Sequence, residues 1–193
     1  MGRLTLILGG ARSGKSRYAM QLARQHGGRV TYIATAQNLD TEMQTRIENH
    51  RRERPPEWQT LEIPRNVGRA FQFQAPLADL VLLDCLTMLV SNVILETSGS
   101  QDQTDESQAR EAVQIEIEDL LAIIRASQSS WIVVSNEVGM GLVPPYPLGR
   151  LYRDLLGWAN QMLAAQASQF YFMVAGIPLP IHRLGMQRGE NLW

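Results

Sequence analysis

Lysine and cysteine are almost absent from this chain of 193 residues. Lys15 is the only lysine among 18 basic residues, and Cys85 is the only cysteine, so no internal disulfide can form. A lone cysteine is typical of a reducing compartment, and we expect a cytoplasmic protein. No apolar run approaches the ~20 residues of a membrane-spanning helix, and no signal-peptide pattern precedes the first predicted strand. We therefore expect a soluble protein with no membrane span.

An excess of either charge is also missing. The formal net charge is −1, so no global positive field favours nucleic acid or an anionic membrane. Hydrophobic residues make up 45% of the chain and charged residues 19%, which is the balance of a globular protein rather than of a fibrous or disordered one. We expect a single domain over residues 1–193 whose partners are small molecules and not nucleic acid.

A glycine-rich loop is the most informative segment that is present. Residues 9–16 read GGARSGKS and match the pattern G-x-x-x-x-G-K-[ST]. In such a P-loop the glycines let backbone N–H groups surround phosphate oxygens, while the lysine reaches the β- and γ-phosphates and the serine ligates Mg²⁺. An ordinary glycine-rich turn is the alternative. Because the only lysine of the chain stands at Lys15, we favour the P-loop.

Short apolar runs alternate with amphipathic segments along the chain. We predict buried strands at residues 4–8, 30–34, 80–84, 131–135 and 170–175, with a weaker edge strand at 58–63. We predict helices at residues 17–24, 40–52, 65–74, 111–125 and 148–167, the second with Asp40 as its N-cap. Residues 96–107 are expected to form a polar surface loop, and residues 176–180 to close the last strand. The alternation predicts an α/β fold, a doubly wound and mostly parallel sheet with helices on both faces.

Polar residues follow the predicted strands at the edge where such sheets bind ligands. Asp84 ends the apolar run 80–84, as in a Walker B strand, and we expect it to hold Mg²⁺ together with Ser16. Residues 35–37 follow the second strand and either contact nucleotide or form a plain connector. Asn136 follows the strand at 131–135 and is expected at the same edge.

A basic cluster ends the predicted helix at 40–52. His50 lies in its last turn, and Pro55 stops the helix soon after the neighbouring arginines. Arginines at this place can neutralise a triphosphate, and a neutral imidazole is a nucleophile. The alternative is a solvated basic helix end that is favourable to the helix dipole.

Two simpler classes of nucleotide-binding protein explain part of this pattern. A small-molecule kinase needs the P-loop and Asp84 but not His50. A GTP-dependent switch needs an N-K-x-D motif, which a chain whose only lysine lies in the P-loop cannot have. The residues alone therefore predict a Mg²⁺-dependent P-loop nucleotide enzyme and do not identify its acceptor.

Seven segments, in order and spacing, resemble one enzyme family. They are GGARSGKSR (9–17), YIATAQ (32–37), a histidine block (40–62), LLDCLTMLVSN (82–92), VSNEVGMGLVP (134–144), RD..G..NQ.LA (153–164) and VAGIPL (174–179). Together they resemble the bifunctional adenosylcobinamide kinase / adenosylcobinamide-phosphate guanylyltransferase family of cobalamin biosynthesis over residues 4–181. This sequence departs from the family pattern in having Asp84 where some members have glutamate. It also has His182 where relatives often end in lysine, and an extension at 183–193.

The resemblance implies a RecA-like P-loop sheet, a homotrimer and two reactions. One reaction phosphorylates the side-chain hydroxyl of adenosylcobinamide with ATP or GTP, a choice that stays open. The other transfers GMP from GTP to adenosylcobinamide phosphate through a guanylylated histidine. The implied catalytic residues are His50 and Lys15, and the implied Mg²⁺ ligands are Ser16 and Asp84. The implied nucleotide-binding residues are Gly9, Gly10, Ala11, Arg12, Ser13, Gly14, Lys15, Ser16, Thr35, Ala36, Gln37, Arg51, Arg52, Glu53, Arg54, Glu62 and Asp84.

Overall fold

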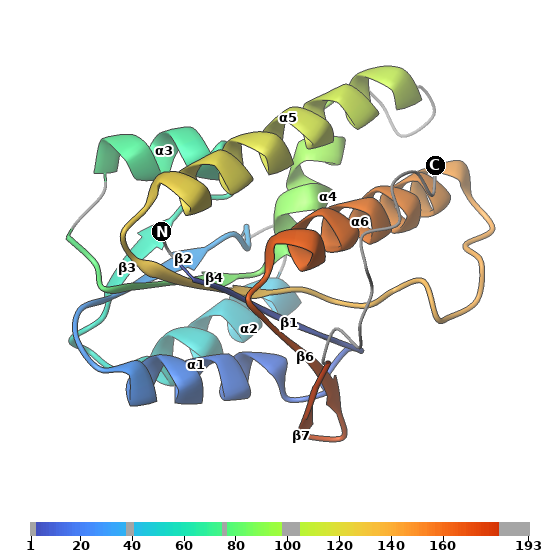
Figure 1. The fold of residues 1–193 in the computed structure, drawn as a ribbon. Helices are drawn as coiled ribbons and strands as arrows, with labels where there is room; N and C mark the ends of the chain where they lie inside the picture. Colours follow the sequence, from blue (N-terminus) through green and yellow to red (C-terminus); the bar gives the residue numbers. More distant parts are fainter. Residues whose placement is uncertain (1–2, 38–40, 75–76, 98–104, 182–193) are drawn as a thin grey trace.

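The computed structural model describes residues 3–37, 41–74, 77–97 and 105–181, which form a seven-stranded sheet between two layers of helices (Figure 1). The strands are β1 (Leu4–Gly9), β2 (Val30–Ala34), β3 (Gln59–Glu62), β4 (Leu80–Asp84), β5 (Ser130–Val134), β6 (Gln169–Val174) and β7 (Ile177–Pro180). They lie in the order β3-β2-β4-β5-β1-β6-β7. Every neighbouring pair is parallel except β6 and β7.

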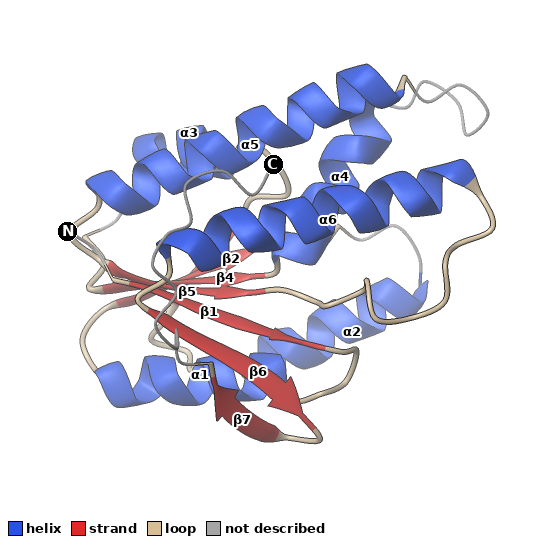
Figure 2. Cartoon of the chain, turned by 45° about the vertical axis from the view of Figure 1, so that its right-hand side comes forward, coloured by secondary structure: helices blue, strands red, loops and turns tan. Residues whose placement is uncertain are grey.

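Helices cover both faces of this sheet. They are α1 (Lys15–His26), α2 (Thr41–Arg52), α3 (Val67–Gln74), α4 (Leu86–Thr97), α5 (Glu106–Ala126) and α6 (Pro147–Gln166). Figure 2 shows α1 and α2 on one face and α3 to α6 on the other. Because both faces are covered, the central strands are mostly apolar, and β1 and β2 are buried along their whole length.

Side-chain alternation along the strands divides the core into two layers. In β2, Tyr32 packs in the layer beneath α1, while Ile33 packs in the larger layer beneath α3 to α6. In the larger layer, Trp131 of β5 meets Phe71 of α3 edge to face, with ring centroids 5.0 Å apart. The sheet is therefore sandwiched between two cores, as a doubly wound fold requires.

The structure confirms the predicted doubly wound, mostly parallel α/β fold. In the described part of the chain, no helix is both long and apolar enough to cross a membrane. β5 lies between β1, which leads into the P-loop, and β4, which ends at Asp84. Because these strands and β2 are parallel, the carboxyl ends of β1, β2, β4 and β5 lie at one edge.

The segment 176–180, predicted to close the last strand, does more than that, because residues 177–180 form a seventh strand. β7 pairs antiparallel with β6, and Val174 faces Ile177 across a two-residue turn. Ala175 and Gly176 have φ values of 50° and 83°, the left-handed pair that a type I′ hairpin turn needs. The prolines of β7 are tolerated because β7 is an edge strand.

The predicted loop at 96–107 is too long at both ends. α4 runs on to Thr97, and α5 already begins at Glu106. Asp105 is the N-cap of α5, and its side chain accepts hydrogen bonds from two backbone N–H groups of the first turn. Residues 98–104 lie outside the described residues, as does Asp40, the predicted N-cap of α2.

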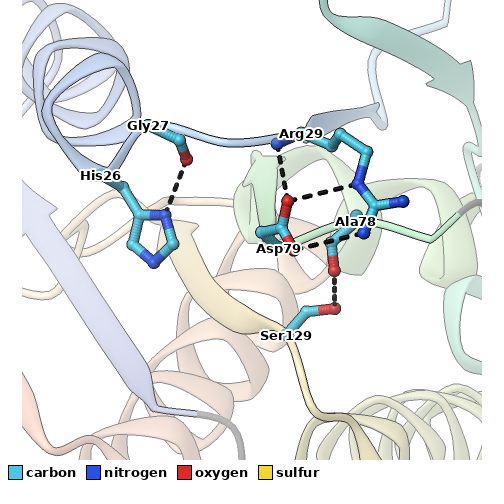
Figure 3. Close-up of polar contacts among 6 residues, drawn as sticks. All are labelled: His26, Gly27, Arg29, Ala78, Asp79 and Ser129. Atoms are coloured by element: carbon cyan, nitrogen blue, oxygen red, sulfur yellow. Dashed lines mark hydrogen bonds and ion pairs between the residues drawn. The ribbon is translucent and has the colours of Figure 1, made fainter.

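The edge opposite the ligand edge is fastened by an ion pair between Arg29 and Asp79 (Figure 3). The backbone N–H of Arg29 donates to Asp79 Oδ2 at 2.8 Å, and the guanidinium donates to both carboxylate oxygens at 3.3 Å. The Arg29 hydrogen bonds lower the pKa of Asp79. His26 ends α1 at this edge, about 15 Å along the helix from Ser16 at 1.5 Å per residue.

Candidate active site

The P-loop joins β1 to α1 along a backbone path that requires glycine. Gly9 has a φ of 154° and Gly14 a φ of 93°, both in the left-handed region. A Cβ atom at Gly9 would lie only 2.6 Å from the Met173 carbonyl oxygen. Gly14 is the N-cap of α1 and has no side chain to compete with a ligand for the first-turn N–H groups. The loop therefore ends at a helix N-terminus suited to a phosphate.

Lys15 is held over this loop instead of extending into solvent. Its side chain is buried, with 7% exposed, and Nζ donates to the Gly10 carbonyl oxygen at 2.6 Å. Nζ also donates to Ser13 Oγ at 3.5 Å. The only ammonium side chain of the protein is thus held against the loop by the Gly10 carbonyl and Ser13.

A cleft of about 340 Å³ lies between α2 and the ligand edge of the sheet. Its size falls within the roughly 300–1,000 Å³ of small-molecule sites. The predicted site residues that line it are Ser16, Ala36, His50, Arg51, Arg54, Glu62 and Asp84. The fold therefore brings together the P-loop serine, the carboxylate that ends β4 and the basic end of α2, which lie far apart in the sequence.

The Asp84 carboxylate is oriented by a neighbouring strand. Tyr32 of β2 donates its hydroxyl hydrogen bond to Asp84 Oδ2 at 2.9 Å. Burial raises the pKa of Tyr32 well above its usual value, and the Asp84 charge raises it further, so the phenol stays protonated and remains a donor. Asp84 and Ser16 face the same cleft, the pair from which a P-loop enzyme builds its Mg²⁺ site.

Two arginines, one at the end of α2 and one in the turn after it, are each held by a contact. Arg51 forms an ion pair with Glu62 at the end of β3, and both side chains are more than half exposed. The Arg54 guanidinium stacks on Tyr32, with Cζ 3.7 Å from the ring centroid. His50, in the last turn of α2, precedes both arginines, is half-buried and lines the cleft with them.

Other residues that were predicted to contact the nucleotide do not line the cleft. Thr35 is fully buried, and its hydroxyl donates to the Cys85 carbonyl oxygen at 2.7 Å and accepts from the Cys85 N–H at 2.9 Å. Thr35 therefore ties the end of β2 to the end of β4. Gln37 and Arg52 do not line the cleft, and Glu53 uses its carbonyl oxygen to accept a hydrogen bond from Arg24 at 3.0 Å.

The sequence did not indicate most of the remaining cleft wall. These residues are Tyr32, Ala34, Met43, Gln44, Ile47, Glu48, Cys85, Thr87 and Met88, besides the expected Asn136. Met43 and Ile47 have the i, i+4 spacing that puts them on one face of α2, a usable signal. Thr87 acts through its hydroxyl, which accepts a hydrogen bond from the Asn136 N–H at 2.8 Å. That role depends on how α4 packs against the end of β5, which the sequence does not give.

Together, the loop, the strand-end carboxylate and the sheet topology define a P-loop nucleotide-binding α/β protein. A protein-family model described as cobinamide kinase / cobinamide phosphate guanyltransferase matches residues 5–181. The chain belongs to this family, as its sequence motifs predicted.

Characterised relatives match along nearly the whole chain. The bifunctional adenosylcobalamin biosynthesis protein CobU of Escherichia coli (strain K12) is 39% identical over 180 residues, covering 92% of this chain and 99% of that protein. The bifunctional adenosylcobalamin biosynthesis protein CobP of Pseudomonas aeruginosa PAO1 is 42% identical over 176 residues, covering 91% of this chain and 95% of that protein. Among solved structures, the RadB recombinase aligns with a TM-score of 0.49 and 17% identity over 89% of this chain and 74% of that one.

Proposed function

We propose that this protein is a bifunctional enzyme of cobalamin biosynthesis. It phosphorylates the side-chain hydroxyl of adenosylcobinamide with ATP or GTP, and it then transfers GMP from GTP to the resulting phosphate, giving adenosylcobinamide-GDP. The observation that carries this proposal is that His50, Arg51 and Arg54 line the same cleft as Ser16 and Asp84. Of these residues, a kinase needs only Ser16 and Asp84, whereas a covalent nucleotidyltransferase also needs a nucleophile.

The guanylyl transfer proceeds in two displacements at the α-phosphorus of GTP. An imidazole nitrogen of His50 attacks this phosphorus, a P–N bond forms, and the bond to the leaving pyrophosphate breaks. A phosphate oxygen of adenosylcobinamide phosphate then attacks the same phosphorus, and the P–N bond breaks to free His50. Arg51 and Arg54 are placed to stabilise the negative charge that develops on the phosphate oxygens, and Lys15 holds the β- and γ-phosphates.

The kinase reaction takes place at the γ-phosphorus of the nucleotide and not at the α-phosphorus. The corrinoid hydroxyl attacks the γ-phosphorus, the nucleoside diphosphate leaves, and no covalent bond to the protein is needed. His50 is therefore dispensable for this step, whereas Lys15 and Asp84 serve both reactions. This asymmetry makes the two activities separable by mutation.

Mg²⁺ fits the residues that the cleft presents. The described residues contain no group of three or more His, Cys, Asp or Glu side chains arranged to hold a metal ion. Mg²⁺ in nucleotide enzymes needs no such cage, because one or two protein ligands act with substrate phosphates and water. Ser16 and Asp84 would supply those ligands, and the bound ion would neutralise phosphate charge.

The proposal is tested by incubating the purified protein with α-labelled GTP and Mg²⁺. We expect the wild type to become labelled, and His50→Ala to lose both the label and guanylyl transfer while it keeps appreciable kinase activity. His26→Ala is the matched control, since His26 lies at the opposite edge of the sheet, and it should label normally. Phosphorylation without any labelling of the wild type would instead indicate a simple P-loop kinase.

A further inference from the structure

The Tyr32 side chain contacts both the Arg54 guanidinium and the Asp84 carboxylate of the cleft. Tyr32 is 2% exposed, its hydroxyl donates to Asp84 Oδ2 at 2.9 Å, and its ring carries the Arg54 guanidinium at 3.7 Å. Tyr32 begins the segment YIATAQ, but the sequence assigned it no role in the site. Its position nevertheless determines where two charged groups of the site point.

The strand register explains why Tyr32 reaches Asp84. Ala34 faces Asp84 across the β2–β4 ladder, and Tyr32 faces Leu82. Tyr32 and Asp84 are thus diagonal neighbours on one face of the sheet, and the phenol side chain spans the distance between them. The bond uses one lone pair of one carboxylate oxygen, and a carboxylate offers about four such acceptor sites. The contact therefore fixes the carboxylate plane and leaves it able to bind a metal ion.

Arg54 depends on the same ring. It follows α2 in a turn, where its N–H donates to the Arg51 carbonyl oxygen at 3.4 Å. Its Nε atom is buried without a hydrogen-bond partner among the described residues. Stacking on Tyr32 thus helps to orient this long side chain, whose guanidinium lies at the cleft.

We propose that Tyr32 is a positioning residue of the active site, whose hydroxyl orients Asp84 toward the metal ion and whose ring orients Arg54 toward the nucleotide phosphates. This inference rests on the function proposed above, because it assigns Asp84 and Arg54 to one bound nucleotide. It predicts that the two effects are separable. Tyr32→Phe keeps the ring and loses the hydroxyl, whereas Tyr32→Leu loses both.

Binding measurements separate the two effects without relying on turnover. The nucleotide is α,β-methylene-GTP, in which the bond that His50 would break is replaced by a stable one, and the metal probe is Mn²⁺. Calorimetry first measures nucleotide binding in EDTA, and then Mn²⁺ binding to the nucleotide complex. For Tyr32→Phe we expect Mn²⁺ binding to weaken on the order of tenfold and metal-free nucleotide binding to stay within about twofold of wild type. For Tyr32→Leu both should weaken.

Two controls make the outcome decisive. Tyr171→Phe removes a hydroxyl from β6, where the Tyr171 ring packs against Tyr18 of α1, and it should change neither affinity. Arg54→Leu should weaken nucleotide binding and leave Mn²⁺ binding to the complex nearly unchanged. Tyr32→Phe with wild-type Mn²⁺ affinity would overturn the role of the hydroxyl, even in a protein that labels normally with GTP. A wild-type protein that binds neither probe would overturn the proposed function as well.

Discussion

Replacing Asn92 by leucine should destabilise the protein although Asn92 contacts no predicted ligand. Asn92 lies on α4 with 3% of its surface exposed, and Nδ2 donates to the carbonyl oxygens of Thr35 at 2.8 Å and Pro64 at 2.9 Å. These bonds fasten the segments that follow β2 and β3 to the helix that follows β4. Leucine has a similar volume, so the change removes the hydrogen bonds and creates little cavity.

The size of the effect follows from the groups left without partners. Each lost bond costs about 1 kcal/mol, and a buried carbonyl left unpaired costs about 1–3 kcal/mol. Against this, Asn92 Oδ1 is itself buried without a hydrogen-bond partner among the described residues, and leucine removes that atom. The net expectation is a loss of about 2 kcal/mol in the free energy of unfolding, with a range of about 1–4 kcal/mol.

Urea denaturation measures this loss directly. With an m-value of about 2 kcal/mol/M, the midpoint should fall by about 1 M at unchanged m. Gln161→Ala is the control, an exposed amide on α6 whose removal should cost less than about 0.5 kcal/mol. If Asn92→Leu unfolded at the same urea concentration as the control, the two hydrogen bonds would not stabilise the fold and this reasoning would be refuted.

Three further predictions concern the phosphates, a buried acid and the assembly. Lys15→Ala and Asp84→Ala should each lower both activities by about 10²-fold or more with the fold intact, and near-normal turnover by either variant would contradict a shared site. Burial raises the pKa of Glu116 from its usual 4.5, so the folded state binds more protons there than the unfolded state, and stability falls as pH rises through this titration. Glu116→Gln should remove this pH dependence. The free energy of unfolding of the variant minus that of the wild type should therefore increase from pH 4 upward. A difference that does not change with pH would show that the pKa of Glu116 is not raised. From the family resemblance we propose a cytoplasmic homotrimer, and sedimentation at the 21.7 kDa mass of a single chain would exclude the trimer.

Much of the fold could be predicted because its signals are local. Each central strand is an apolar run, and the predicted ranges for β2 and β4 match the observed ones. β7 was missed because a short segment with two prolines has low strand propensity, and only pairing with β6 makes it a strand. The loop at 96–107 was predicted too long because polar residues end α4 and begin α5.

The candidate site was predictable where a motif is contiguous and not where it depends on packing. The P-loop and Asp84 stand out in the sequence, and the structure lines one cleft with Ser16, Asp84 and His50. The roles of Tyr32 and Asn92 are set by strand register and by helix docking, neither of which a sequence pattern encodes. For residues 35–37 the sequence left two alternatives, and the structure places only Ala36 on the cleft wall.

In the proposed function, His50 carries GMP between GTP and the corrinoid phosphate. The most direct test is to incubate the protein with GTP and Mg²⁺, digest it without acid, and map the modified peptide by mass spectrometry. We predict GMP on His50, through a bond that is labile in acid and stable in alkali, as a P–N bond should be. GMP on His26 or His182, or an adduct that still forms in His50→Ala, would contradict the account.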